Sequence, residues 1–168
     1  MSELHLTPLR VIPENIPGEL KRKRQWVNWK FEMRDGKEKK VPKRPNGRNA
    51  ESDNPATWSS FRTCLNAFVS GSQFKGIGFV FNYDYTGIDF DNCIDRLTGR
   101  IIDPFVEEWI GRCNSYTEYS QSGDGLHIIL RGVKPGNKCV RTRDSVKIEM
   151  YDHGRFFIMT GDVYRRQE

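Results

Sequence analysis

Two aspartates, Asp89 and Asp91, stand on one short apolar stretch of this chain, TGIDFDN. In a β-strand, residues two apart point to the same face, so both carboxylates would share one face of a sheet. Like charges held side by side repel each other, and the repulsion costs more where water is scarce. A bound divalent cation would offset that cost.

Two further features carry complementary chemistry. In SQSGDGLH a Ser/Gly-rich loop enters a strand near His127, and Glu149 is a lone acid between Ile148 and Met150. Taken singly, these features have ordinary explanations, namely a strand end, a hydrogen-bonded core histidine and a solvent-facing acid. Together, the three carboxylates Asp89, Asp91 and Glu149 form an all-oxygen ligand set, which suits Mg²⁺ or Mn²⁺ rather than zinc.

A site with two such ions supports phosphoryl transfer. Ions about 3.5–4 Å apart activate an attacking hydroxyl and stabilise the leaving oxygen. The Ser/Gly loop offers backbone N–H groups and hydroxyls to phosphate oxygens, and His127 would donate a hydrogen bond to the same phosphates. The predicted ligand is therefore a nucleoside triphosphate carried on metal ions.

The order of these motifs resembles a known family. GIDFDN, then YTEYSQSGDGLHIIL, then IEMYDHGRFFIMTGD are similar to the three motifs of the archaeo-eukaryotic primase superfamily. The closest resemblance is to the primase-polymerase domains of phage and plasmid replication proteins. The upstream segments QWVNWK, KKVPKRPNG and DNPATWSSF match as well, so the resemblance covers about residues 20–162.

The resemblance implies an α+β fold with an RRM-like sheet, mixed or antiparallel, flanked by helices. It also implies template-directed nucleotidyl transfer, with DNA primase and DNA polymerase activity, in the replication of a phage, plasmid or other mobile element. Asp89, Asp91 and Glu149 would hold the two metal ions and act as the catalytic residues. The residues implied in triphosphate binding are Ser120, Ser122, Gly123 and His127, with Arg155 and Lys40 as further phosphate contacts.

The implied partners are a DNA template and primer, with dNTP or NTP as substrate. Some relatives carry a zinc motif, and larger ones continue into a helical domain and a hexameric helicase. Nothing after TGDVYRRQE supplies either. We therefore expect one catalytic domain over residues 1–168, either as the N-terminal fragment of a longer replication protein or working with a partner helicase.

Charge is unevenly distributed along the chain. The net charge is +5, yet residues 21–48 alone carry +9, which leaves −4 for the rest. A concentrated basic segment is typical of a polyanion-binding surface, although a merely solvated face would have the same composition. We expect Lys39, Lys43 and Arg44 in this segment to contact nucleic acid.

Other sequence features exclude some classes of protein. The cysteines form no C-x-x-C pair, which argues against a zinc ribbon or a disulfide framework. There is no apolar run of about 18 residues and no signal peptide pattern in MSELHLTPLR, so a soluble cytoplasmic protein is expected.

Periodicity predicts the elements that must position these residues. QWVNWKFEM and EKKVPKRP form a hairpin across an Asp-Gly turn, with the second strand at a sheet edge because of its prolines. Helices are predicted over 55–69 and 103–113, with a short one begun by Pro17. Strands are predicted at the ranges 76–81, 87–91, 115–120 and 126–132, and at 145–152 and 155–162 on either side of a turn at Gly154.

Three other classes of protein share some of these features. A topoisomerase-primase domain places its Glu before its Asp-x-Asp, whereas Glu149 comes last here. A rolling-circle initiator needs a His-hydrophobic-His motif, which His5, His127 and His153 do not form. A non-catalytic single-strand binder would stack bases on Trp26, Trp29 or Trp58, but periodicity favours core packing for Trp29 and Trp58, and a binder has no use for three acids.

Overall fold

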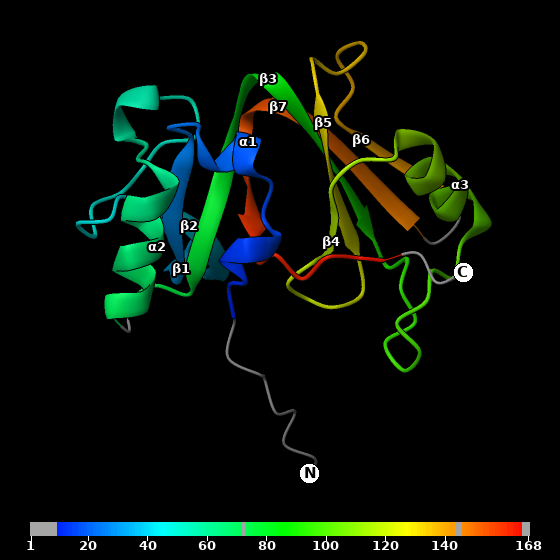
Figure 1. The fold of residues 1–168 in the computed structure, drawn as a ribbon, viewed down its shortest axis with the longest axis horizontal. Coiled ribbons are helices and arrows are strands. Elements are labelled where there is room, and N and C mark those ends of the chain that lie inside the picture. The colour runs from blue at the N-terminus through cyan, green and yellow to red at the C-terminus, as the bar shows by residue number, and fades with distance from the viewer. Residues whose placement is uncertain (1–9, 72, 144–145, 166–168) are drawn as a thin grey trace.

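The computed structural model describes residues 10–71, 73–143 and 146–165, whose seven strands form one sheet (Figure 1). The helices are η1 (Pro13–Asn15), α1 (Gly18–Lys21), η2 (Pro55–Thr57), α2 (Phe61–Ser70) and α3 (Pro104–Cys113), of which η1 and η2 are single 3₁₀ turns. The strands are β1 (Trp26–Arg34), β2 (Lys37–Lys43), β3 (Gly76–Asp91), β4 (Thr117–Tyr119), β5 (Leu126–Arg131), β6 (Val140–Arg143) and β7 (Val146–Met159).

The two longest strands, β3 and β7, cross the molecule and connect its two halves (Figure 1). The first part of β3 pairs with β1 and its last part pairs with β5, while β7 lies along its other side in both halves. The strand order is β2-β1-β3-β5-β4, with β6 added at the outer side of β7. Every strand pair in the described residues is antiparallel, so the α+β class is confirmed and the sheet is not mixed.

Two predicted turns are wrong, because each is an irregularity within one continuous strand. Residues 82–86 were predicted to separate two strands, and Gly154 to separate two more. Instead β3 and β7 stay paired on both sides of these points, with register shifts between Val80 and Gly87. The backbone takes positive φ at Tyr83 (63°) and at Gly154 (65°). The strands twist locally at these residues, and the regular hydrogen-bonded pairing of β3 with β7 resumes beyond them.

The predicted helix over 55–69 is also wrong at its start. Asn54 does cap a helical turn, but this turn is η2, and the chain is extended again at Trp58 (φ −92°, ψ 164°). The interruption exists because Ser59 forms an isolated bridge with Trp26 of β1. Ser60 then caps α2 by accepting a hydrogen bond from the backbone N–H of Thr63. The second predicted helix is confirmed as α3, with Asp103 as its N-cap.

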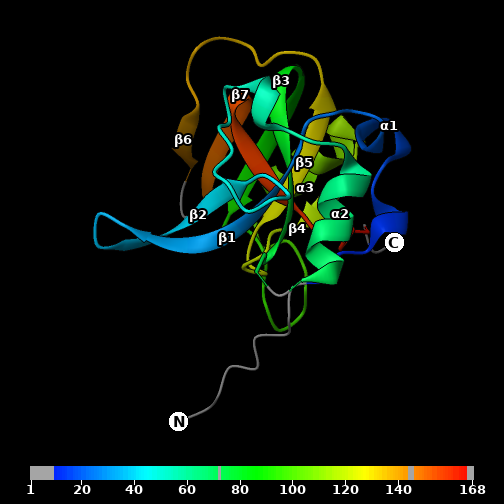
Figure 2. The same cartoon turned by 90° about the vertical axis from the view of Figure 1, so that its left-hand side faces the viewer.

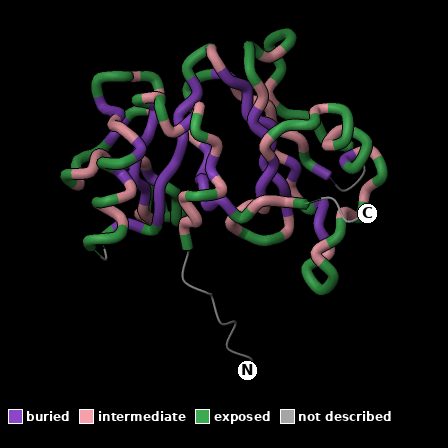
Figure 3. The backbone as a smooth tube through the Cα atoms, in the orientation of Figure 1, coloured by how far each residue is buried: buried purple, intermediate pink, exposed green. Residues whose placement is uncertain are grey.

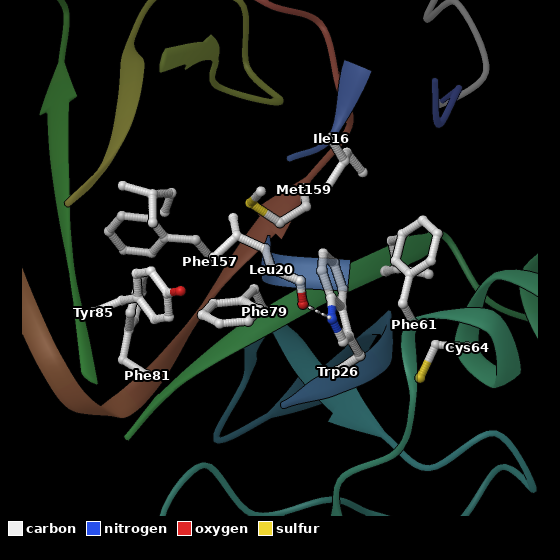
Figure 4. Close-up of a cluster of buried hydrophobic side chains, with 12 residues drawn as sticks. Ile16, Leu20, Trp26, Phe61, Cys64, Phe79, Phe81, Tyr85, Phe157 and Met159 are labelled. Carbon is white, nitrogen blue, oxygen red and sulfur yellow. Dashed lines mark hydrogen bonds between the residues drawn. The ribbon is translucent and has the colours of Figure 1, made fainter. Parts of the chain in front are cut away.

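Hydrophobic clusters fill both halves, and buried residues gather on the strands of each (Figure 3). In one half, Trp26 and Phe79 pack with Phe61 of α2, and the Trp26 indole donates a hydrogen bond to the carbonyl of Leu20 in α1 (Figure 4). In the other half, α3 inserts Val106 against the strands. No helix in the described residues is long and apolar enough to cross a membrane.

The predicted basic hairpin is confirmed. Strands β1 and β2 pair from Asn28 opposite Lys43 to Arg34 opposite Lys37, and β2 lies at the sheet edge. Their far end projects from the body of the molecule (Figure 2). The hairpin therefore continues the sheet edge into a basic arm that extends beyond the body of the molecule.

Gly87 is the closest packing point where β3 passes from one half to the other. A Cβ atom at this position would overlap the rings of Phe81 and Phe157, which pack on each other at 4.8 Å. The missing side chain therefore permits the contact between the aromatic rings and the backbone of β3.

We predict that Gly87→Ala lowers the free energy of unfolding by about 1–3 kcal/mol, because it overpacks a full core. Urea unfolding measures the change. Gly71→Ala is the matched control, since a Cβ there meets only ordinary contacts, and it should stay within about 0.5 kcal/mol of wild type. Equal effects from the two substitutions would contradict the packing role of Gly87.

Candidate active site

The register of β3 brings three of the predicted site residues into one row. Asp89 lies opposite His127 of β5 on one side and opposite Glu149 of β7 on the other. Residues directly opposite each other on neighbouring strands share a face of the sheet, so all three side chains point the same way. Asp91, two residues further along β3, lies opposite Lys147 on that face.

The reverse face of the same strands is apolar. Phe90 and Ile148 alternate with the acidic residues along β3 and β7, and they pack with Leu126 of β5 in the cluster that α3 covers. The period of two thus separates a charged face from a hydrophobic one. Because the apolar side chains are anchored in the core, the acidic side chains must point to the opposite face of the sheet.

Asp89 and His127 are in contact in a setting that excludes most water. Asp89 Oδ1 lies 3.3 Å from His127 Nε2, and His127 is 8% exposed. Burial acts to lower the pKa of His127, but the carboxylates of Asp89 and Glu118 outweigh it and raise that pKa above its ordinary value. Asp89 Oδ1 thus has His127 Nε2 as its neighbour, whereas His127 Nδ1 is buried without a hydrogen-bond partner among the described residues. His127 Nδ1 therefore has an unused hydrogen-bonding position.

Asp91 carries the electrostatic strain expected of crowded acids. Burial raises its pKa above the ordinary value, and the nearby charges of Asp89, Glu149 and Asp124 raise it further, while Lys147 acts in the opposite direction. Among the described residues, no group of three His, Cys, Asp or Glu side chains is drawn close enough to hold a metal ion. The oxygen donors are thus on one face but not gathered around one point.

Glu149 is held by its neighbours on β7. Its carboxylate forms an ion pair with Lys147 and accepts a hydrogen bond of 2.8 Å from the Tyr151 hydroxyl. Arg155, also predicted at the site, donates to that hydroxyl at 3.1 Å and lies 4.0 Å from Glu149 Oε2. Phosphate binding by Arg155 stays a prediction. Lys147 and Tyr151 were not predicted.

Backbone hydrogen bonds hold the Ser/Gly loop against the residues that follow Asp91 in the chain. The Asp124 carbonyl accepts hydrogen bonds from the backbone N–H groups of Cys93 (2.8 Å) and Ile94 (3.0 Å). Ser120 Oγ lies 2.9 Å from Ser122 Oγ and accepts from the N–H of Gly125 at 3.1 Å. A Cβ at Gly125 would collide with the carbonyl of Phe90, so the loop approaches β3 as closely as glycine permits.

Asp124 and its partner Arg96 were missed from the sequence. Burial acts to raise the pKa of Asp124, but hydrogen bonds from Ser122 and Arg96 prevail and lower it. Arg96 Nη2 lies 2.6 Å from Asp124 Oδ2. The only signal was the acid within SGDG, which composition alone would assign to a turn.

Lys40 lies on β2 in the other half, where its residue is exposed, and its charge interacts with the acids of the carboxylate face. Burial lowers the pKa of Lys40, while the carboxylates of Asp89, Asp91 and Asp124 act to raise it. Phosphate binding by Lys40 stays a prediction.

The remaining basic residues of the hairpin have different surroundings. Lys39 is exposed and pairs with Asp35 at 3.1 Å, and Arg44 Nε donates to the carbonyl of Asn49 at 3.2 Å. Lys43 is buried, and its ammonium group pairs with Glu32 at 2.5 Å. Binding of nucleic acid by these lysines and Arg44 stays a prediction, and burial sets Lys43 apart from the other two.

Glu118, on β4, continues the row formed by Glu149, Asp89 and His127 onto a fourth strand. It was not predicted from the sequence. It lies opposite His127 on β4 and is 1% exposed. Burial raises its pKa, and it accepts hydrogen bonds from the Tyr116 hydroxyl (2.6 Å) and from the backbone N–H groups of Thr160 and Gly161 (both 2.9 Å). Glu118 thus ties the end of β7 to β4 beside the site.

Comparison with known proteins is consistent with this arrangement. No protein-family model matches the chain. A DNA primase-polymerase of Nitratiruptor phage NrS-1 is 33% identical over 150 residues, which is 86% of this chain. The chain spans 20% of the length of that relative. The similarity supports a primase-polymerase relationship.

We predict that Asp91→Asn stabilises the metal-free protein at pH 7. The folded-state pKa of Asp91 is raised, so ionising it opposes folding. Near pH 4, close to the pKa of about 3.9 in the unfolded state, this penalty is small. The penalty grows as pH rises through the folded-state pKa and is complete above it. Urea unfolding in EDTA at pH 4 and pH 7 measures the difference.

Asp53→Asn is the control for this experiment, because Asp53 is exposed on a loop, and it should change stability little at either pH. A stabilisation by Asp91→Asn that is equal at both pH values, or a loss of stability at pH 7, would contradict the assigned repulsion.

Proposed function

We propose that this domain catalyses template-directed nucleotidyl transfer on DNA, acting as the primase/polymerase of a phage-type replication system. The observation that carries the proposal is Asp89 between His127 and Glu149 on one face of the sheet, with Asp91 and the Ser/Gly loop beside it. The similarity to a phage DNA primase-polymerase supports it. The finer fold assignment, an RRM-like catalytic core of archaeo-eukaryotic primase type, is part of the same proposal.

The residues present fit a pair of hard divalent cations. Asp89, Asp91 and Glu149 offer only oxygen, and burial together with the nearby charges of Asp89, Glu149 and Asp124 raises the pKa of Asp91, a penalty on its charged form that a cation would relieve. Glu149 would exchange its contact with Lys147 for the metal. When bound, Mg²⁺ or Mn²⁺ supplies activation of the attacking hydroxyl and stabilisation of the leaving pyrophosphate.

The chain itself would bind and orient the triphosphate. His127 has an unpartnered buried Nδ1 and a raised pKa, so its ring is equipped to donate to phosphate oxygens. Ser120 and Ser122 would supply hydroxyls, with Gly123 shaping the loop turn, in which its N–H donates to the Ser120 carbonyl at 2.9 Å. Lys40 and Arg155 would neutralise phosphate charge from either side.

The template would lie along the basic hairpin, where Lys39 and Arg44 are placed for phosphate contact. Lys43 is left out of this contact because its ammonium group is buried against Glu32. The alternative of a non-catalytic binder loses its proposed stacking platforms, since Trp26, Trp29 and Trp58 are at most 5% exposed. The enzyme is therefore the better-supported proposal.

We predict that Asp89→Asn combined with Asp91→Asn lowers the rate of primer extension at least about 10³-fold, because the ions would lose two carboxylates. The assay follows extension of a labelled primer on a DNA template with Mg²⁺ or Mn²⁺. Asp53→Asn is the control and should extend at the wild-type rate. Undiminished extension by the double variant would refute the metal assignment, and template binding without any extension by wild type would favour the binder.

Lys40 and Lys39 form a matched pair of neighbouring cations. We predict that Lys40→Gln raises the KM for the incoming nucleotide about tenfold or more, because Lys40 lies near the carboxylates and would contact the triphosphate. Lys39→Gln should leave that KM unchanged and instead reduce the salt dependence of template binding by about 0.7 in log–log slope. Steady-state extension and salt titration separate the two effects, and identical behaviour of both variants would contradict the assignment.

A further inference from the structure

The face of the sheet opposite the carboxylates carries a pocket that the proposed reaction does not use. It has a volume of about 260 Å³ and lies between α3, β7, β6 and the loop before β6. Phe90 and Ile148 contribute to its lining, and they directly follow Asp89 and precede Glu149 in the chain. The pocket is thus on the far side of the same two strands that carry the acids.

The walls of this pocket are aromatic and incompletely buried. Phe105 and Trp109 reach it from α3, with ring centroids 5.9 Å apart, and both side chains keep part of their surface open to solvent. Met150 adds to the lining from β7. An open aromatic wall of this kind offers a stacking surface to a flat ring, independent of that ring's identity.

The rim of the pocket is positively charged. Lys138 and Arg141 line it, and the guanidinium of Arg143 lies 4.1 Å from the centre of the Phe105 ring. None of the described lining residues is acidic. The complementary ligand therefore combines a flat apolar body with negative charge.

Strand β6 connects this rim with the carboxylate face. All four residues of β6 are exposed; Val140 lies opposite Glu149, and Arg141 lies opposite Ile148. Arg141 and Arg143 are two residues apart on one face of the strand, about 6.6 Å, which is close to the separation of successive phosphates in an extended nucleic-acid strand. A strand leaving the carboxylate face can pass round this edge onto the rim.

We propose that this pocket binds one base of a single-stranded nucleic acid, while Lys138, Arg141 and Arg143 contact the adjoining phosphates. The choice of nucleic acid over an acidic peptide rests on the proposed function and on the pocket's size, which suits one ring system rather than a row of apolar side chains. Arg141 and Arg143 lie on β6, the strand next to the one that carries Glu149. The pocket would therefore fix the path of the nucleic-acid strand just outside the reaction centre.

Trp109 provides a direct readout of base binding. The other tryptophans, Trp26, Trp29 and Trp58, are buried in the opposite half, so a base in the pocket should quench Trp109 alone. The titration uses oligo(dT) and an abasic oligonucleotide of the same length and charge, in EDTA and without nucleotide. Oligo(dT) should quench the emission and bind at least about fivefold more tightly than the abasic strand. The quench should be lost in Trp109→Phe.

The rim is tested with Lys138→Gln combined with Arg141→Gln, both exposed positions. The variant should bind oligo(dT) about tenfold more weakly at low salt, with the log–log salt slope reduced by about 1.4. Arg62→Gln combined with Lys75→Gln removes two exposed cations beside the other half and should leave both quantities near wild type.

Equal binding and quenching by the abasic strand, or a rim variant that behaves like the control, would overturn the proposal. Quenching of Trp109 by an acidic Glu/Phe peptide but not by oligo(dT) would overturn it too and assign the pocket to a protein partner. Primer extension is scored separately. Loss of the proposed catalysis with retained base-dependent quenching would refute the enzyme and leave the pocket standing.

Discussion

The site depends on one constraint, which is the register of β3 against both of its neighbours. Asp89 is opposite His127 on β5 and opposite Glu149 on β7, so a single strand aligns two groups that lie 38 and 60 residues further along the chain. A slip of one residue in either pairing would turn one partner to the α3 face. The apolar alternation of Phe90, Leu126 and Ile148 fixes that register, because these side chains must face the core.

The same constraint explains why charge can be concentrated where water is scarce. Asp91 lies in a field of like charges, and Glu149 is compensated by Lys147 and held by Tyr151. Compensation by a lysine can be exchanged for compensation by a cation without moving the strand. In the proposed function, the sheet would fix the positions of the donors, and side-chain rotation would bring their oxygens together around the ions.

Much of this could be predicted from the sequence where local pattern and tertiary contacts agree. The basic hairpin, α3 with its Asp103 cap and the shared face of Asp89 and Asp91 follow from period, caps and turn residues. The continuity of β3 and β7 could not be predicted, because NYDYT and Gly154 have turn chemistry and only pairing between two distant strands carries the ladder through them. Strand β6 has no apolar alternation, and its pairing with β7 holds it in place.

For the candidate site, the motifs predicted the acids, His127 and the loop, but not the residues that contact them. Glu118, Asp124 and Tyr151 act through contacts with segments far away in sequence or with a neighbouring side chain, which no spacing rule reveals. The role of Lys40 was predicted only through resemblance and stays a prediction.

The central claim is that Asp89, Asp91 and Glu149 together hold the divalent ions that act on a nucleoside triphosphate. The most direct measurement is a crystal structure of the protein with Mn²⁺ and a nucleotide, in which anomalous scattering locates the metal. The account predicts manganese bonded to carboxylate oxygens of all three residues and to the triphosphate, with Glu149 released from Lys147. Manganese bound elsewhere, or a triphosphate held with Glu149 still paired to Lys147, would contradict it.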